Sequence, residues 1–250
     1  MNPLIAEFIG TAILVLLGNG VVANAILKDT KGSPGNWVLI TAGWGLAVYV
    51  AVLCTAPYSG AHINPAVTVG LVAAGLFPAA DMPGYILAQL AGGMTGAVLV
   101  FVTYRNHFNA SDDQGAKLGC FSTAPNIRSI PTNFFSELIG TFILVFAVLG
   151  ISEGTISWVG SGAENLPEGK VGLGSIGALP VALVVVSIGM SLGGTTGYAI
   201  NPARDLGPRI VHQLLPIRGK GDSDWPYAWV PIVGPIAGAL LAAVIYAAVM

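Results

Sequence analysis

Long apolar stretches recur along the chain at a length that suits membrane crossing. A helix needs about 20 apolar residues to span a hydrocarbon layer of about 30 Å. Six stretches meet this requirement, at about 4–27, 37–57, 84–104, 132–152, 176–196 and 226–250. Charged and polar residues gather in the two long connections, 105–130 and 152–175. The pattern predicts an all-α membrane protein with six transmembrane helices.

Two further apolar segments are too short to cross, and both begin with Asn-Pro-Ala. The motif consists of Asn64, Pro65 and Ala66 in the first segment and of Asn201, Pro202 and Ala203 in the second. Each segment holds about a dozen residues, which as a helix reach halfway through a bilayer. Asn is a favourable N-cap, and Pro at the first helical position loses no needed donor. We predict two re-entrant half-helices.

The chain repeats itself at a distance of about 130 residues. Residues 9–15 match residues 139–145 at six of seven positions, and Glu7 and Glu137 precede them at equal distance. Each half holds three spans and one half-helix, and an odd number of spans inverts the second copy relative to the first. We expect one channel-like domain over residues 1–250, with inverted halves at about 4–104 and 132–250 joined by loop 105–131.

Composition supports the membrane assignment and excludes several functions. Charged residues make up 9% of the chain, whereas a soluble domain carries about 25%. Mean hydropathy is +0.76, so most of the surface must face a lipid bilayer. The net charge of −2 offers no basic field for nucleic acid. Two cysteines are too few for a disulfide scaffold or a thiolate metal site, and we expect no metal and no cofactor.

The inverted repeat gives the half-helices a shared role. Their N-termini should meet near mid-membrane, with non-helical entry loops that are tolerated only in protein or beside a water-filled cavity. The loop residues expected to line this pore are Gly60, Ala61 and His62 in the first half and Gly197 and Ala199 in the second. Two helix N-termini, at about +0.5 charge each, would repel protons and cations while neutral molecules pass.

Taken together, these motifs resemble the aquaporin superfamily over nearly the whole chain. Ser-Gly-Ala-His precedes the first Asn-Pro-Ala box, and Arg-Asp follows the second. Residues 197–209 are similar to bacterial glycerol uptake facilitators, in which Asp usually follows the arginine, as Asp205 does here. The resemblance implies a passive channel, not an enzyme, that conducts glycerol and other small neutral solutes with water. It also implies a homotetramer in a bacterial plasma membrane.

By position, the resemblance implies a selectivity filter of four residues: Trp44, Gly189, Tyr198 and Arg204. Trp44 and Tyr198 would form an apolar corner for a carbon backbone, while Arg204 donates hydrogen bonds to hydroxyl groups. Gly189 would leave the width that a histidine fills in a water-only channel. Tyr198 departs from the Phe that is common there, and its phenol oxygen would narrow the corner or add a polar contact.

Buried acidic residues leave an alternative open. Glu7 and Glu137 lie inside predicted spans, where carboxylates either bind backbone amides of the half-helix loops or relay protons. We favour the structural role, and we expect Asp205 to anchor its loop through backbone amides or a nearby cation. The remaining alternatives are a water-selective aquaporin, against which Gly189 and Asp205 argue, and a proton-coupled secondary transporter.

Two further expectations concern the location of histidines and of basic residues. His107 and His212 are expected in loops or on helix surfaces. With the N-terminus inside, as in the family, most Lys and Arg residues would lie outside, whereas the positive-inside rule favours the reverse orientation.

Overall fold

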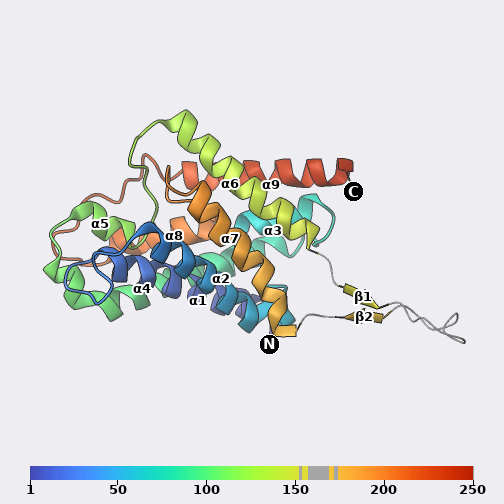
Figure 1. Cartoon of the computed structure of the whole chain (residues 1–250), viewed down its shortest axis with the longest axis horizontal. Coiled ribbons are helices and arrows are strands. Elements are labelled where there is room, and N and C mark those ends of the chain that lie inside the picture. The colour runs from blue at the N-terminus through green and yellow to red at the C-terminus, as the bar shows by residue number, and fades with distance from the viewer. Residues whose placement is uncertain (152–153, 157–168, 172–173, 250) are drawn as a thin grey trace, which may run out of the picture.

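A computed structural model of the chain describes residues 1–151, 154–156, 169–171 and 174–249 (Figure 1). Its α-helices are α1 (Pro3–Ile26), α2 (Trp37–Ser59), α3 (Pro65–Ala73), α4 (Met82–Ala110), α5 (Gln114–Gly119), α6 (Ile130–Gly150), α7 (Leu179–Ser191), α8 (Pro202–Leu214) and α9 (Val230–Val249). Within these described ranges, six helical segments are long and apolar enough to cross a membrane: α1, α2, α4, α6, α9, and α7 with the preceding 3-10 turn η2 (Gly174–Ala178). The prediction of an all-α membrane fold with six spans is confirmed.

The two half-helices begin where the sequence places them. Asn64 caps α3 by accepting a hydrogen bond from the Ala66 N–H at 2.9 Å. Asn201 caps α8 in the same way, from the Ala203 N–H at 3.0 Å. The first half-helix is shorter than expected, because Gly75 at φ +73° ends it and the Leu76 N–H turns back to the Leu71 carbonyl, a glycine stop typical of helix C-termini.

The packing of the spans follows the repeat. α1 packs against α2 and α4, and α6 packs against α7 and α9. Each half-helix also packs against the last span of the other half, α3 on α9 and α8 on α4. Glycines allow the closest approaches: a Cβ at Gly92 would lie 2.3 Å from the Phe8 carbonyl oxygen, and one at Gly238 would lie 2.2 Å from that of Leu138.

Connection 105–130 contains more helix than its polar sequence indicates. α4 continues to Ala110, where the buried Phe108 packs between Phe101 and Phe121. A short helix, α5, follows because Asp113 caps it through the Ala116 N–H at 3.0 Å. The fold also contains a small antiparallel pair, β1 (Gly154–Ile156) with β2 (Gly169–Val171), which no pattern in the sequence indicates.

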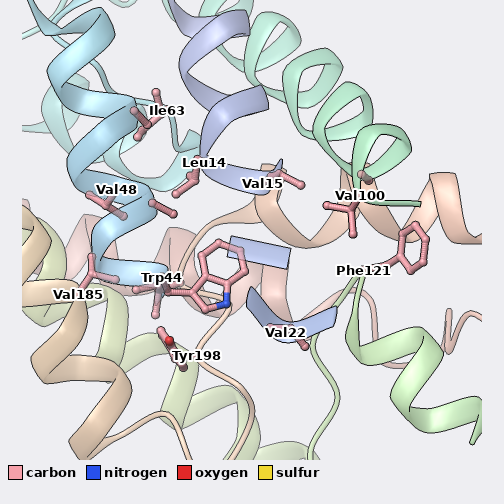
Figure 2. Close-up of a cluster of buried hydrophobic side chains, with 14 of the residues drawn as sticks. Leu14, Val15, Val22, Trp44, Val48, Ile63, Val100, Phe121, Val185 and Tyr198 are labelled. Atoms are coloured by element: carbon pink, nitrogen blue, oxygen red, sulfur yellow. The ribbon is translucent and has the colours of Figure 1, made fainter. Parts of the chain in front are cut away.

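The buried core lies between the helices, and the outer faces are apolar as well. Figure 2 shows part of the core cluster, in which Leu14, Val48 and Val185 from three different helices lie above and beside Trp44, and Tyr198 lies below it in the view. Large aliphatic side chains such as Leu46, Leu87 and Val102 are exposed on the outside of the spans. An apolar exterior of this kind is suited to lipid rather than water.

Candidate functional site

The two half-helices meet through their capping asparagines. The Asn64 side-chain amide donates to the Ile200 carbonyl at 2.8 Å, and that of Asn201 donates to the Ile63 carbonyl at 2.8 Å. These reciprocal bonds hold the N-terminal ends of α3 and α8 against each other. Since each amide has two N–H donors, one fastens the opposite loop and the second is left for the lumen.

A cavity of about 220 Å³ runs past this junction. Both entry loops and both asparagines line it, together with aliphatic side chains from four of the spanning helices. The lining includes Gly60, Ala61, His62, Ile63 and Asn64 from the first loop and Tyr198, Ala199, Ile200, Asn201 and Arg204 from the second half. Gly197, expected from the sequence to line the pore, is not among the lining residues, and a Cβ at this position would lie 3.3 Å from the Thr123 side chain.

The entry loops have an unusual backbone that repeats between the halves. Positive φ angles occur at Gly60 (79°), Ala61 (50°) and Ile63 (44°), and again at Gly197 (84°), Tyr198 (37°) and Ile200 (41°). Left-handed conformations are unfavourable for residues other than glycine. The surrounding contacts must therefore hold both loops in place.

Glu7 supplies these contacts for the first loop. Its carboxylate accepts hydrogen bonds from the Ser59 hydroxyl at 2.6 Å, the His62 N–H at 2.9 Å and the Ile63 N–H at 2.7 Å. The Gln89 side-chain amide donates a fourth, at 2.7 Å. Four hydrogen-bond donors stabilise this carboxylate in its buried position.

Glu137 does the same for the second loop. It accepts from the Thr196 hydroxyl at 2.7 Å, the Ala199 N–H at 2.9 Å and the Ile200 N–H at 2.8 Å. Both glutamates are fully buried. Their geometry favours the structural role over a proton relay, because both oxygens of each carboxylate already accept hydrogen bonds from its own loop.

Arg204 lies at one end of the cavity, against Trp44. Its guanidinium carbon is 4.2 Å from the Trp44 ring centroid, which is cation–π geometry. One guanidinium nitrogen donates to the Phe121 carbonyl at 3.5 Å. No sequence signal points to Phe121, which is 83 residues away and acts through its backbone.

Asp205 turns away from the cavity and fixes the loop before α6. Its carboxylate accepts from the Thr123 N–H and hydroxyl, both at 2.7 Å. Its other oxygen accepts from Arg209 at 2.9 Å, inside a fully buried ion pair. Asp205 thus binds a backbone amide and a cation, but the loop that it contacts is that of Thr123, 82 residues earlier, and not its own.

Tyr198 occupies the room that Gly189 provides. A Cβ at Gly189 would lie 2.8 Å from Cζ of Tyr198 and 3.0 Å from its hydroxyl oxygen. Gly189 is not among the residues that line the cavity, whereas Tyr198 is. The width expected from Gly189 is therefore taken by the Tyr198 ring. The phenol oxygen is buried and has no hydrogen-bond partner among the described residues, so no added polar contact within the protein is observed.

The histidines differ from each other. His62 lines the cavity, with Nδ1 3.1 Å from the Thr68 hydroxyl and its ring against Phe77 and Tyr85. The expectation for His212 is wrong: it is fully buried. Its Nδ1 lies 2.8 Å from the Ser223 hydroxyl because the chain after α8 folds back over it.

Basic residues tie together the loops at the Arg204 end. Lys117 donates to the Arg218 carbonyl, and Lys220 donates to three carbonyls at the end of α8. Hydrogen bonding to Asp224 raises the pKa of Arg128. These three cations therefore hold loop segments to one another and to the end of α8.

Comparison with known proteins gives consistent matches over the full length. A sequence model of the family described as "Major intrinsic protein" matches residues 1–246. A probable glycerol uptake facilitator of Thermotoga maritima is 50% identical over 98% of both chains, and one of Streptococcus pneumoniae is 48% identical with the same coverage. The aquaglyceroporin structure of Plasmodium falciparum superposes with a TM-score of 0.81 at 34% identity, covering 99% of this chain and 95% of that one.

Proposed function

This chain belongs to the major intrinsic protein family, and we propose that the cavity between its half-helices is the conduction path. The protein is a passive channel of the plasma membrane, not an enzyme; it conducts glycerol and other small neutral solutes together with water. The observation that carries the proposed path is the reciprocal pair of bonds from Asn64 and Asn201 within one cavity lined by both loops.

Exclusion of protons and cations follows from charge at two levels of the path. The N-termini of α3 and α8 together place about one positive charge at the junction, at about +0.5 each. Arg204 adds a full positive charge at one end. A neutral polyol meets little electrostatic cost at either point, whereas a cation meets repulsion at both.

The Arg204 end also suits a polyol sterically and chemically. Trp44 and Tyr198 present apolar surface to carbon atoms, while Arg204 offers N–H donors beyond the one directed to Phe121. We propose that Trp44, Tyr198 and Arg204 form the selectivity filter, with Gly189 seating Tyr198. Glu7 and Glu137 both accept hydrogen bonds from the loops. A proton-coupled transporter would need a free titrating group, and neither glutamate provides one.

Shrink–swell measurement on reconstituted vesicles tests the function. Under a glycerol gradient, vesicles with the protein should re-swell faster than empty vesicles, without ions, nucleotides or a proton gradient. A sucrose gradient reports water permeability on the same vesicles. Glycerol permeability equal to that of empty vesicles would contradict the glycerol channel, and water permeability alone would favour a water-selective aquaporin.

We also propose a homotetramer in the lipid bilayer, with one path in each subunit. The exposed apolar faces of the spans provide surface both for lipid and for neighbouring subunits. Native mass spectrometry of the detergent-solubilised protein should give four times the chain mass of 25.5 kDa. A predominantly monomeric species in native lipid would contradict this assembly.

A further inference from the structure

Trp37 connects the end of one helix to a residue that lines the cavity. It is the first residue of α2 and lies outside the cavity lining. Its indole N–H donates to the Gly189 carbonyl at 2.9 Å. Its ring meets the Tyr198 ring edge-on, with centroids 5.8 Å apart and planes at 79°. One side chain thus contacts both α7 and the aromatic residue seated on it.

Tyr198 rests in a notch made by two glycines of α7 and the turn that follows it. A Cβ at Gly189 would lie 2.8 Å from the ring, and one at Gly193 would lie 2.4 Å from ring atom Cδ1. A Cβ at Gly193 would also lie 3.0 Å from the Trp37 ring. Trp37, Gly193 and Tyr198 are therefore in mutual contact, and the notch holds the phenol ring only because no side chain fills it.

The first half of the chain has no such notch and no ring to place in it. Ala61 stands where the second half has Tyr198, one residue after the loop glycine. Val52 and Ala56, eight and four residues before Gly60, stand where Gly189 and Gly193 precede Gly197. Gly189 and Gly193 thus occur in the half that has Tyr198, and not in the half that has alanine at that position.

An interfacial tryptophan at a helix end is common as a membrane anchor. An anchor directs its indole N–H to lipid headgroups or water. Trp37 instead donates to a main-chain carbonyl of α7. Trp225, at 41% exposure against 38% for Trp37, has its own N–H bond to the Gln213 side chain at 3.1 Å and provides a matched comparison.

We propose that Trp37 is a positioning residue for solute selectivity: it holds Tyr198 in the Gly189–Gly193 notch and so fixes the width of the filter without touching the solute. The proposal rests on the proposed glycerol channel. When Trp37 is replaced by a smaller residue, the Tyr198 ring gains room on its Trp37 side and moves back from Arg204. The lumen then widens, and larger polyols gain more than glycerol does.

The test measures permeability to glycerol, xylitol and water in vesicles that contain equal amounts of correctly inserted protein. Trp37→Leu should raise the xylitol-to-glycerol ratio about fivefold, the size expected when a contact of ordinary hydrogen-bond strength no longer restrains the ring. Trp37→Phe keeps an aromatic edge but loses the N–H donor, and should give an intermediate ratio. Trp225→Phe, the control, should leave the ratio at the wild-type value.

A double variant separates positioning from a general structural effect. In a Tyr198→Ala background Trp37 has no ring to hold, so adding Trp37→Leu should not change the ratio further. Lower flux of all three solutes with an unchanged ratio would overturn the proposal, as would an additive effect in the Tyr198→Ala background. A wild-type protein without glycerol flux would overturn the channel function as well, which distinguishes the two failures.

Discussion

The two ends of the lumen share a backbone but differ in side chains. Both entry loops have the same sequence of positive φ angles, and each is tied to a buried glutamate of its own half. The asparagine contacts between the loops are equal in length, at 2.8 Å. The contacts that hold the loops and bring the two helix N-termini together are therefore duplicated.

Three lining side chains, Trp44, Tyr198 and Arg204, have small or aliphatic residues at the matching positions, whereas His62 of the first loop matches Ala199. Tyr198 and Arg204 correspond to Ala61 and Val67, which lie 137 positions earlier. At the same offset, Trp44 corresponds to Val181. Val67, Ala61 and Val181 all line the cavity. The meeting of two helix N-termini therefore needs both repeats, whereas each residue of the proposed filter is present in one copy only.

Both aromatic residues of the proposed filter lie against a glycine of a neighbouring helix. A Cβ at Gly18 would lie 2.2 Å from the Trp44 ring. The residue 130 positions after Gly18 is Val148, at the end where the matching ring is absent. Each aromatic ring of the proposed filter therefore requires the space that a neighbouring glycine leaves.

The largest effect is expected where the two halves are most alike. Glu137→Leu leaves three buried donors without an acceptor, each costing about 1–3 kcal/mol. Glu7→Leu leaves four and should destabilise more. Thermal unfolding in detergent measures both, with the exposed Asp112→Leu as control. Midpoints at the wild-type value would show that the carboxylates do not support the loops.

A second prediction closes the notch that distinguishes the second half. Gly189→His places a side chain where Tyr198 already lies, 2.8 Å from the Cβ position. The ring must move into the lumen, so glycerol permeability should fall about tenfold, equivalent to about 1.4 kcal/mol, and water permeability should fall less. Gly194→His, with open space around its Cβ position, is the control. Equal loss of glycerol and water would show that the position does not control size.

A third prediction concerns a substitution that puts the side chain of the first half at the matching position of the second. Arg204→Val copies Val67 and removes both bulk and positive charge from the filter. Permeability to protons or to larger polyols should rise several-fold, about fivefold for each 1 kcal/mol of barrier removed. Vesicles with an entrapped pH dye, and xylitol re-swelling, measure the change. The exposed Arg105→Val serves as control, and unchanged selectivity would remove Arg204 from the filter.

The smallest effect is expected at the phenol oxygen of Tyr198. Tyr198→Phe removes a buried hydroxyl that has no partner in the described part of the chain, so stability should stay within about 1 kcal/mol of wild type. Tyr85→Phe, at a buried tyrosine of α4 near the first loop, removes a bond to the Ser59 carbonyl at 3.1 Å and should destabilise by about 1 kcal/mol. Unfolding midpoints compare the two, and a larger loss for Tyr198→Phe would indicate a partner for its hydroxyl.

The sequence by itself determined the spans, the two half-helices and their caps. These features depend on rules that act over a few neighbouring residues: apolar length against bilayer thickness, Asn before Pro at a helix start, and repeat spacing. The structure also places Trp44, Tyr198 and Arg204 in the lining of one cavity, while their role in selectivity stays a prediction.

Only the tertiary structure decided which groups hold these residues in place. The Phe121 carbonyl beside Arg204, Gln89 on Glu7, Trp37 on Gly189 and the burial of His212 join segments that local patterns treat separately. Gly189 could be identified as small, but not as the seat of Tyr198. The physical reason is that a hydrogen bond or a close contact between distant segments depends on how the helices pack, and hydrophobic periodicity contains no information about partners in space.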